Sequence, residues 1–306
     1  MNHPFADPRL ELAVRAALPQ DVLAQPLRSL TRLDAAALGI RRLLGIEALS
    51  ELRWLDLSRN PLSSLVDLRA NTKLIRLLLR QTGIASLAGL EGLPELEDLD
   101  LSGAQVIDIQ AIEGLPSLRS LDLGLCLVKR LSALATLARL ESLTLGNPTL
   151  ALGRSFFARP QPIELDLSPL RALGRLRQLR LYGLSMRSAA SLDALLGLEE
   201  LVLDRCTFED RLREFPLLAR LEVLSLSDCD VSALRVLTRL PRLRVLCLDE
   251  AEISDLSPLL GCEALESVSL RDVKLNKRGS IDQLRRHPRL AQLRLDNQLV
   301  ELRDRK

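Results

Sequence analysis

Histidine and cysteine have the widest chemical range of the side chains in this sequence, and both are scarce: 306 residues include two histidines and five cysteines. Catalytic triads and Cys/His dyads need a histidine beside a nucleophile, and neither His3 nor His287 is placed to serve one. No Cys/His set has the spacing of a zinc site, and no glycine-rich loop could cradle a phosphate. We therefore expect a protein that is not an enzyme and that holds no metal or cofactor.

The cysteines instead indicate a compartment. Their odd number, spread from Cys126 to Cys262, is unlike the dense, even-numbered cysteines of a small secreted scaffold. The start, MNHPFADPRL, shows no charged segment followed by an apolar run. No stretch of about 18 uncharged apolar residues occurs either. We expect a reduced, cytoplasmic protein with no signal peptide and no membrane span.

An internal repeat supplies the elements that position the polar side chains. The pattern Leu-x-x-Leu-x-Leu begins at Leu52 and recurs until Leu290, with a weaker first copy at Leu30. The starts are 22 residues apart five times, and then 36, 22, 23, 22, 22 and 25 residues apart. One unit cannot bury its leucines alone, so stacked units must share a continuous core. Each copy predicts a short parallel strand whose leucines at positions one, four, six and about eleven point inward.

The second half of each unit resembles a known family. The segments ISDLSPLLGCEAL (253–265) and VIDIQAIEGLPSL (106–118) resemble leucine-rich-repeat proteins of the 22-residue class and are similar to the repeat region of internalins. Asp7 and Pro8, placed to cap an apolar helix, resemble the helical cap that precedes such repeats in many bacterial proteins. The resemblance implies an α/β fold, a right-handed leucine-rich-repeat solenoid. A parallel β-sheet would form its concave face, and 3-10, irregular or short helical segments its convex face.

The sequence divides into three parts. We predict a helical N-terminal cap over residues 1–29 and a solenoid of about twelve units over residues 30–298. A C-terminal capping unit and tail are expected over residues 276–306. The 36-residue spacing indicates an inserted loop at 149–162.

This inserted loop, TLALGRSFFARPQP, contains Phe156 and Phe157. Long loops in a regular scaffold are often functional. The two phenylalanines either touch a partner beside the concave face or plug the seam between two half-arrays.

One departure from the family pattern concerns the ninth residue of each unit. The family usually carries Asn there, bonded to the backbone of the next turn. Here only Asn60 is regular, and Cys126, Cys206 and Cys229 occupy the same column, where Cys is a known alternative. The column is otherwise mostly apolar, so those turns must satisfy their backbone groups in another way.

The residues between the inward leucines should face outward onto the concave face, in the third, fifth, seventh and eighth columns. The only Trp and the only Tyr, Trp54 and Tyr182, fall in these columns. They could anchor a partner, because Trp and Tyr are enriched in interface hot spots. The alternative is that Trp54 lies flat over Arg32 and Arg76 and covers the sheet.

The same columns carry twelve acidic residues and eight arginines, although the whole chain has a net charge of +2. A nucleic acid would require a basic stripe, so we expect none on this face. Asp98, Asp100 and Asp122 fall on adjacent strands and could bind Ca²⁺. We expect them to form a solvated acidic patch balanced by Arg76 and Arg80.

These patterns favour a cytoplasmic, bacterial, non-enzymatic module that binds a partner protein on its concave face. We expect a monomer with no nucleic-acid or membrane partner. Two alternatives stay open: a regulatory or inhibitory subunit of an enzyme such as a phosphatase, and an exported internalin-like effector or surface adhesin. The expected contact residues are Trp54, Asp56, Arg76, Arg80, Asp98, Asp100, Asp122, Phe156, Phe157, Arg180 and Tyr182.

Overall fold

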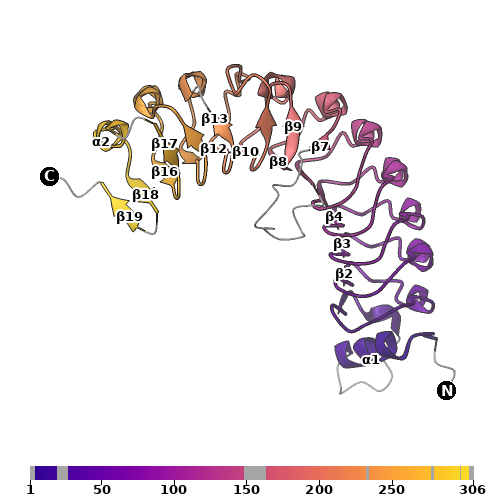
Figure 1. The fold of residues 1–306 in the computed structure, drawn as a ribbon. Helices are drawn as coiled ribbons and strands as arrows, with labels where there is room; N and C mark the ends of the chain where they lie inside the picture. The colour runs from indigo at the N-terminus through magenta and orange to yellow at the C-terminus, as the bar shows by residue number, and fades with distance from the viewer. Residues whose placement is uncertain are drawn as a thin grey trace. The chain divides into compact units, whose positions relative to one another are not determined.

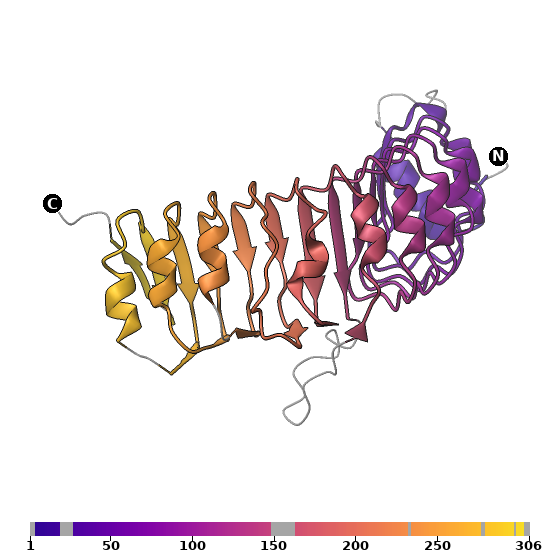
Figure 2. The same cartoon turned by 90° about the horizontal axis from the view of Figure 1, so that it is seen from above.

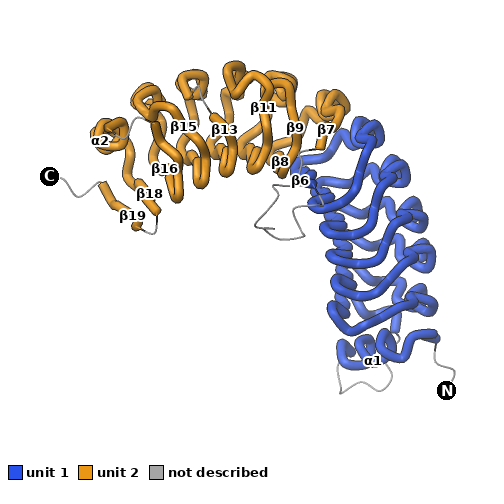
Figure 3. Tube along the Cα trace, viewed as in Figure 1, with its two compact units in different colours: residues 1–153 blue, residues 154–306 orange. Residues whose placement is uncertain are grey.

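The computed structural model describes residues 4–18, 27–147, 163–231, 234–276, 279–296 and 298–302. The chain forms two compact units, residues 1–153 (unit 1) and 154–306 (unit 2) (Figure 3). Within each unit, short strands stack on one side, and 3-10 helices (labelled η) or a short α-helix stack on the opposite side (Figures 1 and 2). The predicted α/β leucine-rich-repeat architecture is therefore confirmed.

Unit 1 opens with α1 (Pro8–Ala17), which Asp7 caps as expected: its carboxylate accepts a hydrogen bond from the Arg9 N–H at 3.0 Å. Six parallel strands then pair in chain order. They are β1 (Arg32–Asp34), β2 (Trp54–Asp56), β3 (Arg76–Leu78), β4 (Asp98–Asp100), β5 (Ser120–Leu123) and β6 (Ser142–Gly146). The 3-10 helices are η1 (Leu27–Ser29), η2 (Ile46–Ala48), η3 (Val66–Ala70), η4 (Leu90–Gly92), η5 (Gln110–Gly114) and η6 (Ser132–Thr136).

Unit 2 continues the same pattern. Its parallel strands are β8 (Gln178–Tyr182), β10 (Glu200–Val202), β12 (Val223–Ser225), β14 (Val245–Cys247), β16 (Ser267–Leu270) and β18 (Gln292–Leu295), and β19 (Gln298–Glu301) adds an antiparallel strand. Two small parallel sheets follow the strand ends: β7 (Ile163–Glu164), β9 (Leu184–Met186) and β11 (Thr207–Phe208), and β13 (Asp230–Val231), β15 (Glu252–Ile253) and β17 (Lys274–Leu275). The helices are η8 (Ser168–Ala172), η9 (Ala189–Leu192), η10 (Leu234–Arg239), η11 (Ser257–Gly261) and α2 (Ser280–Leu284).

Leucines at fixed positions of the repeat form the core. In the second copy, Leu52, Leu55, Leu57 and Leu62 are all fully buried, as the sequence predicts for positions one, four, six and eleven. The parallel register places Leu55 beside Leu77 of the next strand, so equivalent leucines stack in layers. Burying one such side chain contributes about 1.5–3 kcal/mol, which is why neighbouring repeats stabilise one another.

A left-handed turn ends most of the strands. The turn residue is the eighth of the repeat, and among the described repeats it is a glycine with positive φ at Gly103 and Gly183. In other repeats the eighth residue adopts positive φ without being glycine: Ala37, Arg59, Gln81, Leu125, Arg205, Asp228, Glu250 and Asp272. The eighth residue thus belongs to the turn, because its backbone has left the extended region. The outward surface of the strands consists of the third, fifth and seventh residues.

Candidate protein-interaction face

The third, fifth and seventh residues of the repeats form an outward surface that we call the strand face. In unit 1 its third residues are Arg32, Trp54, Arg76, Asp98, Ser120 and Ser142, and its fifth residues are Asp34, Asp56, Leu78, Asp100, Asp122 and Thr144. Parallel pairing in register puts equivalent residues of neighbouring strands side by side, about 4.8 Å apart. Seven predicted contact residues therefore lie together in unit 1: Trp54, Asp56, Arg76, Arg80, Asp98, Asp100 and Asp122.

Trp54 is the first residue of β2 and lies half-buried on this face. The guanidinium carbon of Arg32, on the neighbouring strand, is 3.6 Å from the centroid of the indole ring. Such a cation–π contact contributes about 0.5–1 kcal/mol at an exposed site. The interpretation that Trp54 lies against its neighbours is therefore correct for Arg32, and the stacking holds a partly exposed indole in a fixed position.

The two predicted contact arginines beyond Trp54 are held by carboxylates. Arg76 Nε lies 2.9 Å from Asp98 Oδ2, and Arg80 Nε donates to Asp100 Oδ2. Burial raises the pKa of Asp98 against the lowering effect of Arg76, and the nearby Asp100 raises it further. The prediction of a solvated acidic patch is wrong for Asp100, whose residue is only 4% exposed because Arg80 and its own turn enclose it.

The fifth-position carboxylates also fix the turns that end the strands. Each accepts a hydrogen bond from the N–H two residues further on, which is the Asx-turn geometry that Asp favours. The four bonds are Asp34 to Ala36 (3.3 Å), Asp56 to Ser58 (2.8 Å), Asp100 to Ser102 (3.0 Å) and Asp122 to Gly124 (2.8 Å). A structural role thus accounts for three of the predicted contact residues: Asp56, Asp100 and Asp122. The recurring Asp at the fifth position was the sequence signal for it.

Unit 2 has a strand face of its own, with the predicted contacts Arg180 and Tyr182 on β8. Both side chains are half-buried. Arg180 Nη2 lies 2.7 Å from Glu200 Oε1 on the neighbouring strand β10. The predicted contacts therefore fall into two groups, one in each unit.

A network of small polar groups on the strand face of unit 2 was not anticipated from the sequence. Ser225 Oγ donates to Asp204 Oδ1 at 2.5 Å, and the Ser227 N–H donates to the same oxygen at 3.0 Å. Ser227 Oγ also lies 3.2 Å from Cys247 Sγ. Burial raises the pKa of Asp204, while the bond from Ser225 lowers it. No histidine of the described residues joins this network, because His287 is buried among the C-terminal repeats.

The ninth-position turns satisfy their backbone groups in several ways, as the departure from the Asn pattern requires. Asn60 both donates to and accepts from the backbone, whereas Thr82 and the cysteines only donate to backbone carbonyls. Cys229 has a second carbonyl, that of Ser227, at 3.6 Å. The cysteine bonds are Cys126 to Leu101 (3.1 Å), Cys206 to Leu181 (3.5 Å) and Cys229 to Leu203 (3.0 Å). Burial raises the pKa of Cys126 and Cys206 to about 12. These thiols therefore stay protonated at neutral pH and can donate.

The second residues of several repeats form ion pairs along the stack, which the sequence did not lead us to expect. From Glu97 to Glu266 this position is charged, and acidic and basic residues of neighbouring repeats pair there. The pairs are Glu97–Arg119 (3.7 Å), Arg119–Glu141 (2.6 Å), Arg177–Glu199 (2.8 Å), Glu222–Arg244 (3.7 Å) and Arg244–Glu266 (2.9 Å). Each exposed pair contributes about 0–1 kcal/mol, so the series adds little to stability.

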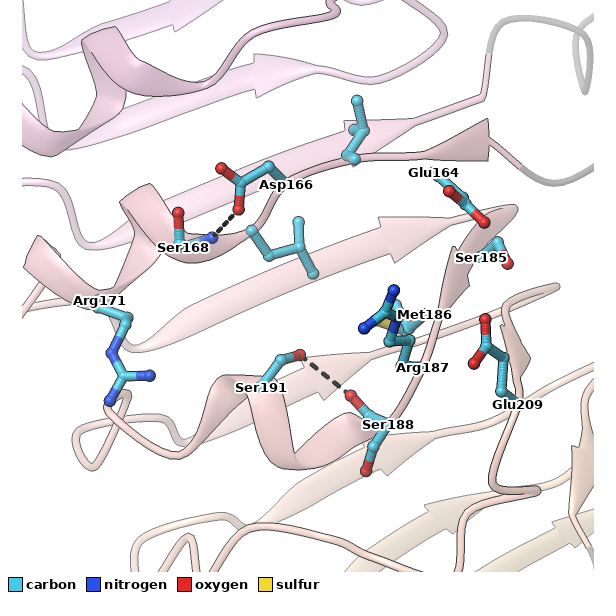
Figure 4. Close-up of a pocket in the computed structure, with 12 residues that line it drawn as sticks. Glu164, Asp166, Ser168, Arg171, Ser185, Met186, Arg187, Ser188, Ser191 and Glu209 are labelled. Carbon is cyan, nitrogen blue, oxygen red and sulfur yellow. Dashed lines mark hydrogen bonds between the residues drawn. The ribbon is translucent and has the colours of Figure 1, made fainter.

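Figure 4 shows a groove of about 700 Å³ in unit 2, between the small sheet β7–β9–β11 and the helices η8 and η9. Three carboxylates line it, from Glu164, Asp166 and Glu209, together with the guanidinium groups of Arg171 and Arg187. Because both signs of charge are interspersed, the groove selects no ion by charge.

The inserted loop, a metal site and a membrane span are the remaining features considered from the sequence. Phe156 and Phe157, with the inserted loop at 149–162, lie outside the described residues. Within the described ranges, no group of three or more His, Cys, Asp or Glu side chains could hold a metal ion. The same part of the chain contains no helix of the length and apolar character needed to cross a membrane.

Comparisons with known proteins agree with this geometry at the level of the fold. No protein-family model matches the sequence, and no curated protein matches it. Among solved structures, the internalin InlF from Listeria monocytogenes is 21% identical and superposes with a TM-score of 0.70, over 98% of this chain and 92% of its own. A leucine-rich-repeat protein from Leptospira interrogans is 24% identical, with a TM-score of 0.62 over 85% of this chain and 70% of its own.

A third solved structure is the plant peptide hormone receptor RGFR1 in complex with RGF2. It is 19% identical, with a TM-score of 0.53 over 75% of this chain and 38% of the receptor chain. The present chain thus spans well under half of that receptor. The three structures together show that this protein has the leucine-rich-repeat fold and is internalin-like in architecture.

Proposed function

We propose that this protein is a non-enzymatic binding module that holds a partner protein on the strand face of unit 1. The observation that carries the proposal is Trp54: the only indole of the chain is half-buried at an outward strand position and is held there by Arg32. Leaving apolar surface in water costs about 25 cal/mol per Å². A partner that covers the ring would recover this free energy, and the fixed ring loses little entropy on binding.

The surroundings of Trp54 support an interface with an apolar centre and a polar rim. Leu78, on the next strand, is also half-buried on this face, and the register places it beside Asp56. Arg76 and Asp98 already form an ion pair, so a partner does not have to neutralise either charge. Aromatic residues are enriched at the centre of interfaces, and charged residues are depleted there.

The remaining contact residues of the proposal form the rim. Their mixed charges suit a partner surface of mixed or mildly basic charge, steered by complementarity rather than by one dominant sign. In unit 1 they are Asp56, Arg76, Arg80, Asp98 and Asp122, whereas the buried Asp100 acts by holding Arg80. Arg180 and Tyr182 are contacts proposed for the separate strand face of unit 2.

Two further observations support this proposal. One neighbour in fold is a peptide hormone receptor in complex with RGF2, so the fold serves recognition in that protein. The five cysteines are free thiols in the described structure, which supports a reducing, cytoplasmic location.

The test is a cross-linking capture from source-cell lysate with wild type, Trp54→Ala and the control Val66→Ala. Val66 is 45% exposed and lies on η3, on the opposite side of the same unit, so its truncation removes exposed apolar surface away from the strand face. We expect one protein to be captured equally by wild type and Val66→Ala, and to fall about tenfold or more with Trp54→Ala. Circular dichroism confirms that each variant is folded.

Capture of the same protein at the same level by folded Trp54→Ala would refute the proposed face. Loss with both variants would show that the capture reports general apolar contact instead of a site.

A further inference from the structure

A row of arginines follows the turns that lead into the strands of unit 2. The residue directly before the first leucine of each repeat is, in order, Arg175, Gly197, Arg220, Arg242, Ala264 and Arg289. Each lies three residues before its strand begins, and the strands pair in register, so the row follows the stack in steps of about 4.8 Å. All four arginines are exposed. We call Arg175, Arg220, Arg242 and Arg289 the arginine row.

None of these four guanidinium groups forms an ion pair with a described residue. Arginines two residues further along the chain behave differently, because Arg177 pairs with Glu199 and Arg244 pairs with Glu266. Carboxylates are thus available beside the row, but they are already engaged with the second-position arginines.

Unit 1 shows that the repeat does not need arginine at this position. The equivalent residues there are Ser29, Glu51, Lys73, Glu95, Ser117 and Arg139. Lys73 even pairs with Glu51 at 2.7 Å, so the charges compensate along the stack. The same turn therefore folds with neutral, acidic or basic residues, and the single sign in unit 2 has no structural explanation.

Two exposed leucines lie in the segments that lead into β10 and β12, and a third lies on η11. Leu196 is 64% exposed, Leu217 is 53% exposed and Leu260 is 41% exposed. They lie two, four and five residues before the first leucine of the following repeat. The segment before β12 thus combines the exposed Leu217 with the unpaired charge of Arg220.

We propose that the arginine row of unit 2 binds an acidic segment of a partner protein, one in which apolar side chains alternate with carboxylates. Carboxylates would pair with the guanidinium groups, for which arginine offers two-pronged hydrogen bonds. The apolar side chains of the segment would cover Leu196 and Leu217, in the segments that lead into β10 and β12. This site is separate from the strand face and does not depend on the function proposed for Trp54.

The charges next to the row favour separate carboxylates over a continuous polyanion. Glu199, Glu222 and Glu266 lie two residues after the row positions, and the exposed Glu263 precedes Ala264. An evenly charged phosphate backbone would run against these carboxylates and be repelled. A peptide can place its acidic residues opposite the arginines and neutral residues opposite the gaps at Gly197 and Ala264.

The probe is a short fluorescent peptide in which glutamate and leucine alternate, titrated with the full chain and followed by fluorescence anisotropy. A second peptide with glutamine in place of glutamate tests whether the charge is required. In the variant protein, Arg220→Gln, Arg242→Gln and Arg289→Gln are combined. We expect this variant to bind the acidic peptide about tenfold more weakly than wild type, with a smaller loss of affinity on adding salt.

The matched control combines Arg42→Gln, Arg69→Gln and Arg130→Gln, which removes the same charge from exposed arginines of unit 1. We expect this control and Trp54→Ala to bind the acidic peptide within about twofold of wild type. An equal loss with both triple variants, or none with the row variant, would overturn the proposal. The proposal would also be overturned if wild type bound a uridine oligonucleotide or phosphatidylserine vesicles more tightly than the peptide and the row variant lost that binding. The row would then serve another class of partner.

Discussion

Asn60 should contribute far more to stability than the other residues at the ninth position, because its side chain serves the backbone in both directions. The residue is 1% exposed. Its Nδ2 donates to the carbonyls of Ala35 at 2.8 Å and Leu57 at 2.9 Å. Its Oδ1 accepts from the N–H groups of Leu38 at 3.1 Å and Ile40 at 2.9 Å. Asn60→Ala therefore leaves four backbone groups without this partner.

The magnitude follows from this count. A buried hydrogen bond contributes about 1 kcal/mol net, so Asn60→Ala should lower the free energy of unfolding by about 4 kcal/mol. Thr82 makes a single bond, to the Leu79 carbonyl at 2.8 Å. Thr82→Ala should therefore cost only about 1 kcal/mol. Asn60→Cys keeps one donor, in the manner of Cys126, and should cost about 3 kcal/mol.

Urea unfolding followed by the fluorescence of Trp54 reports on unit 1, because that indole is the only one in the chain. Hydrogen exchange adds a local measurement, and the amides of Leu38 and Ile40 should lose protection in Asn60→Ala. The reasoning is refuted if Asn60→Ala costs no more than Thr82→Ala. It is also refuted if these two amides keep their protection while the protein loses stability, since the bonds to Asn60 would then not be responsible.

Three further outcomes follow from backbone, titration and thiol chemistry. Gly89 has φ of 110°, and an added Cβ would lie 2.3 Å from the Leu65 carbonyl oxygen; Gly89→Ala should lower the unfolding free energy by about 3 kcal/mol or more, and an unchanged thermal midpoint would contradict this. Burial lowers the pKa of His287 from its ordinary 6.5, so the unfolded chain binds the proton more readily than the folded one. Its contribution to stability is therefore complete above about pH 6.5 and declines below it; His287→Gln should flatten this part of a stability–pH curve, and an unchanged slope would exclude the histidine as the cause. Cys247 is the partly exposed thiol among four buried ones, so a thiol reagent should modify it alone in the folded protein, and Cys247→Ser should abolish the fast reaction; modification of a second cysteine at the same rate would contradict the burial.

The strands and the core could be predicted because a single physical rule repeats along the chain. Leucines two or three residues apart, repeated every 22 residues, can all be buried in only one arrangement, a stack of parallel strands. Leu55 and Leu77 of neighbouring strands do lie side by side. Outward positions follow from the same alternation, so the place of Trp54 on a strand was also predictable. The turn residues were not, because the left-handed conformation at Arg59 or Leu125 has no signature in side chains that seldom adopt it.

The roles of the individual polar residues could be predicted only in part. The position of Asp100 in the repeat places it near Arg80. It does not predict that the carboxylate is buried or that it also caps its own turn. Such roles depend on distances of a few tenths of an ångström, which a periodic pattern does not specify. The alternating charges at the second position, such as Glu97 and Arg119, were visible in the sequence. Their pairing follows from the 22-residue register, which puts equivalent second residues of neighbouring repeats side by side.

Contacts within the chain account for some outward-facing residues and not for others. A residue that such contacts do not account for is a better candidate for binding than one that is merely exposed. Asp56 is outward-facing, yet the turn that it bonds accounts for its presence. Trp54 gains one stacking contact with Arg32 but leaves part of a large apolar ring in water. Arg220 and Arg242 lie one strand apart with like charge and form no ion pair with a described residue. Contacts within the described chain compensate Trp54 only in part, and they leave the two guanidinium groups without an ion pair. We therefore expect a bound partner to supply the rest.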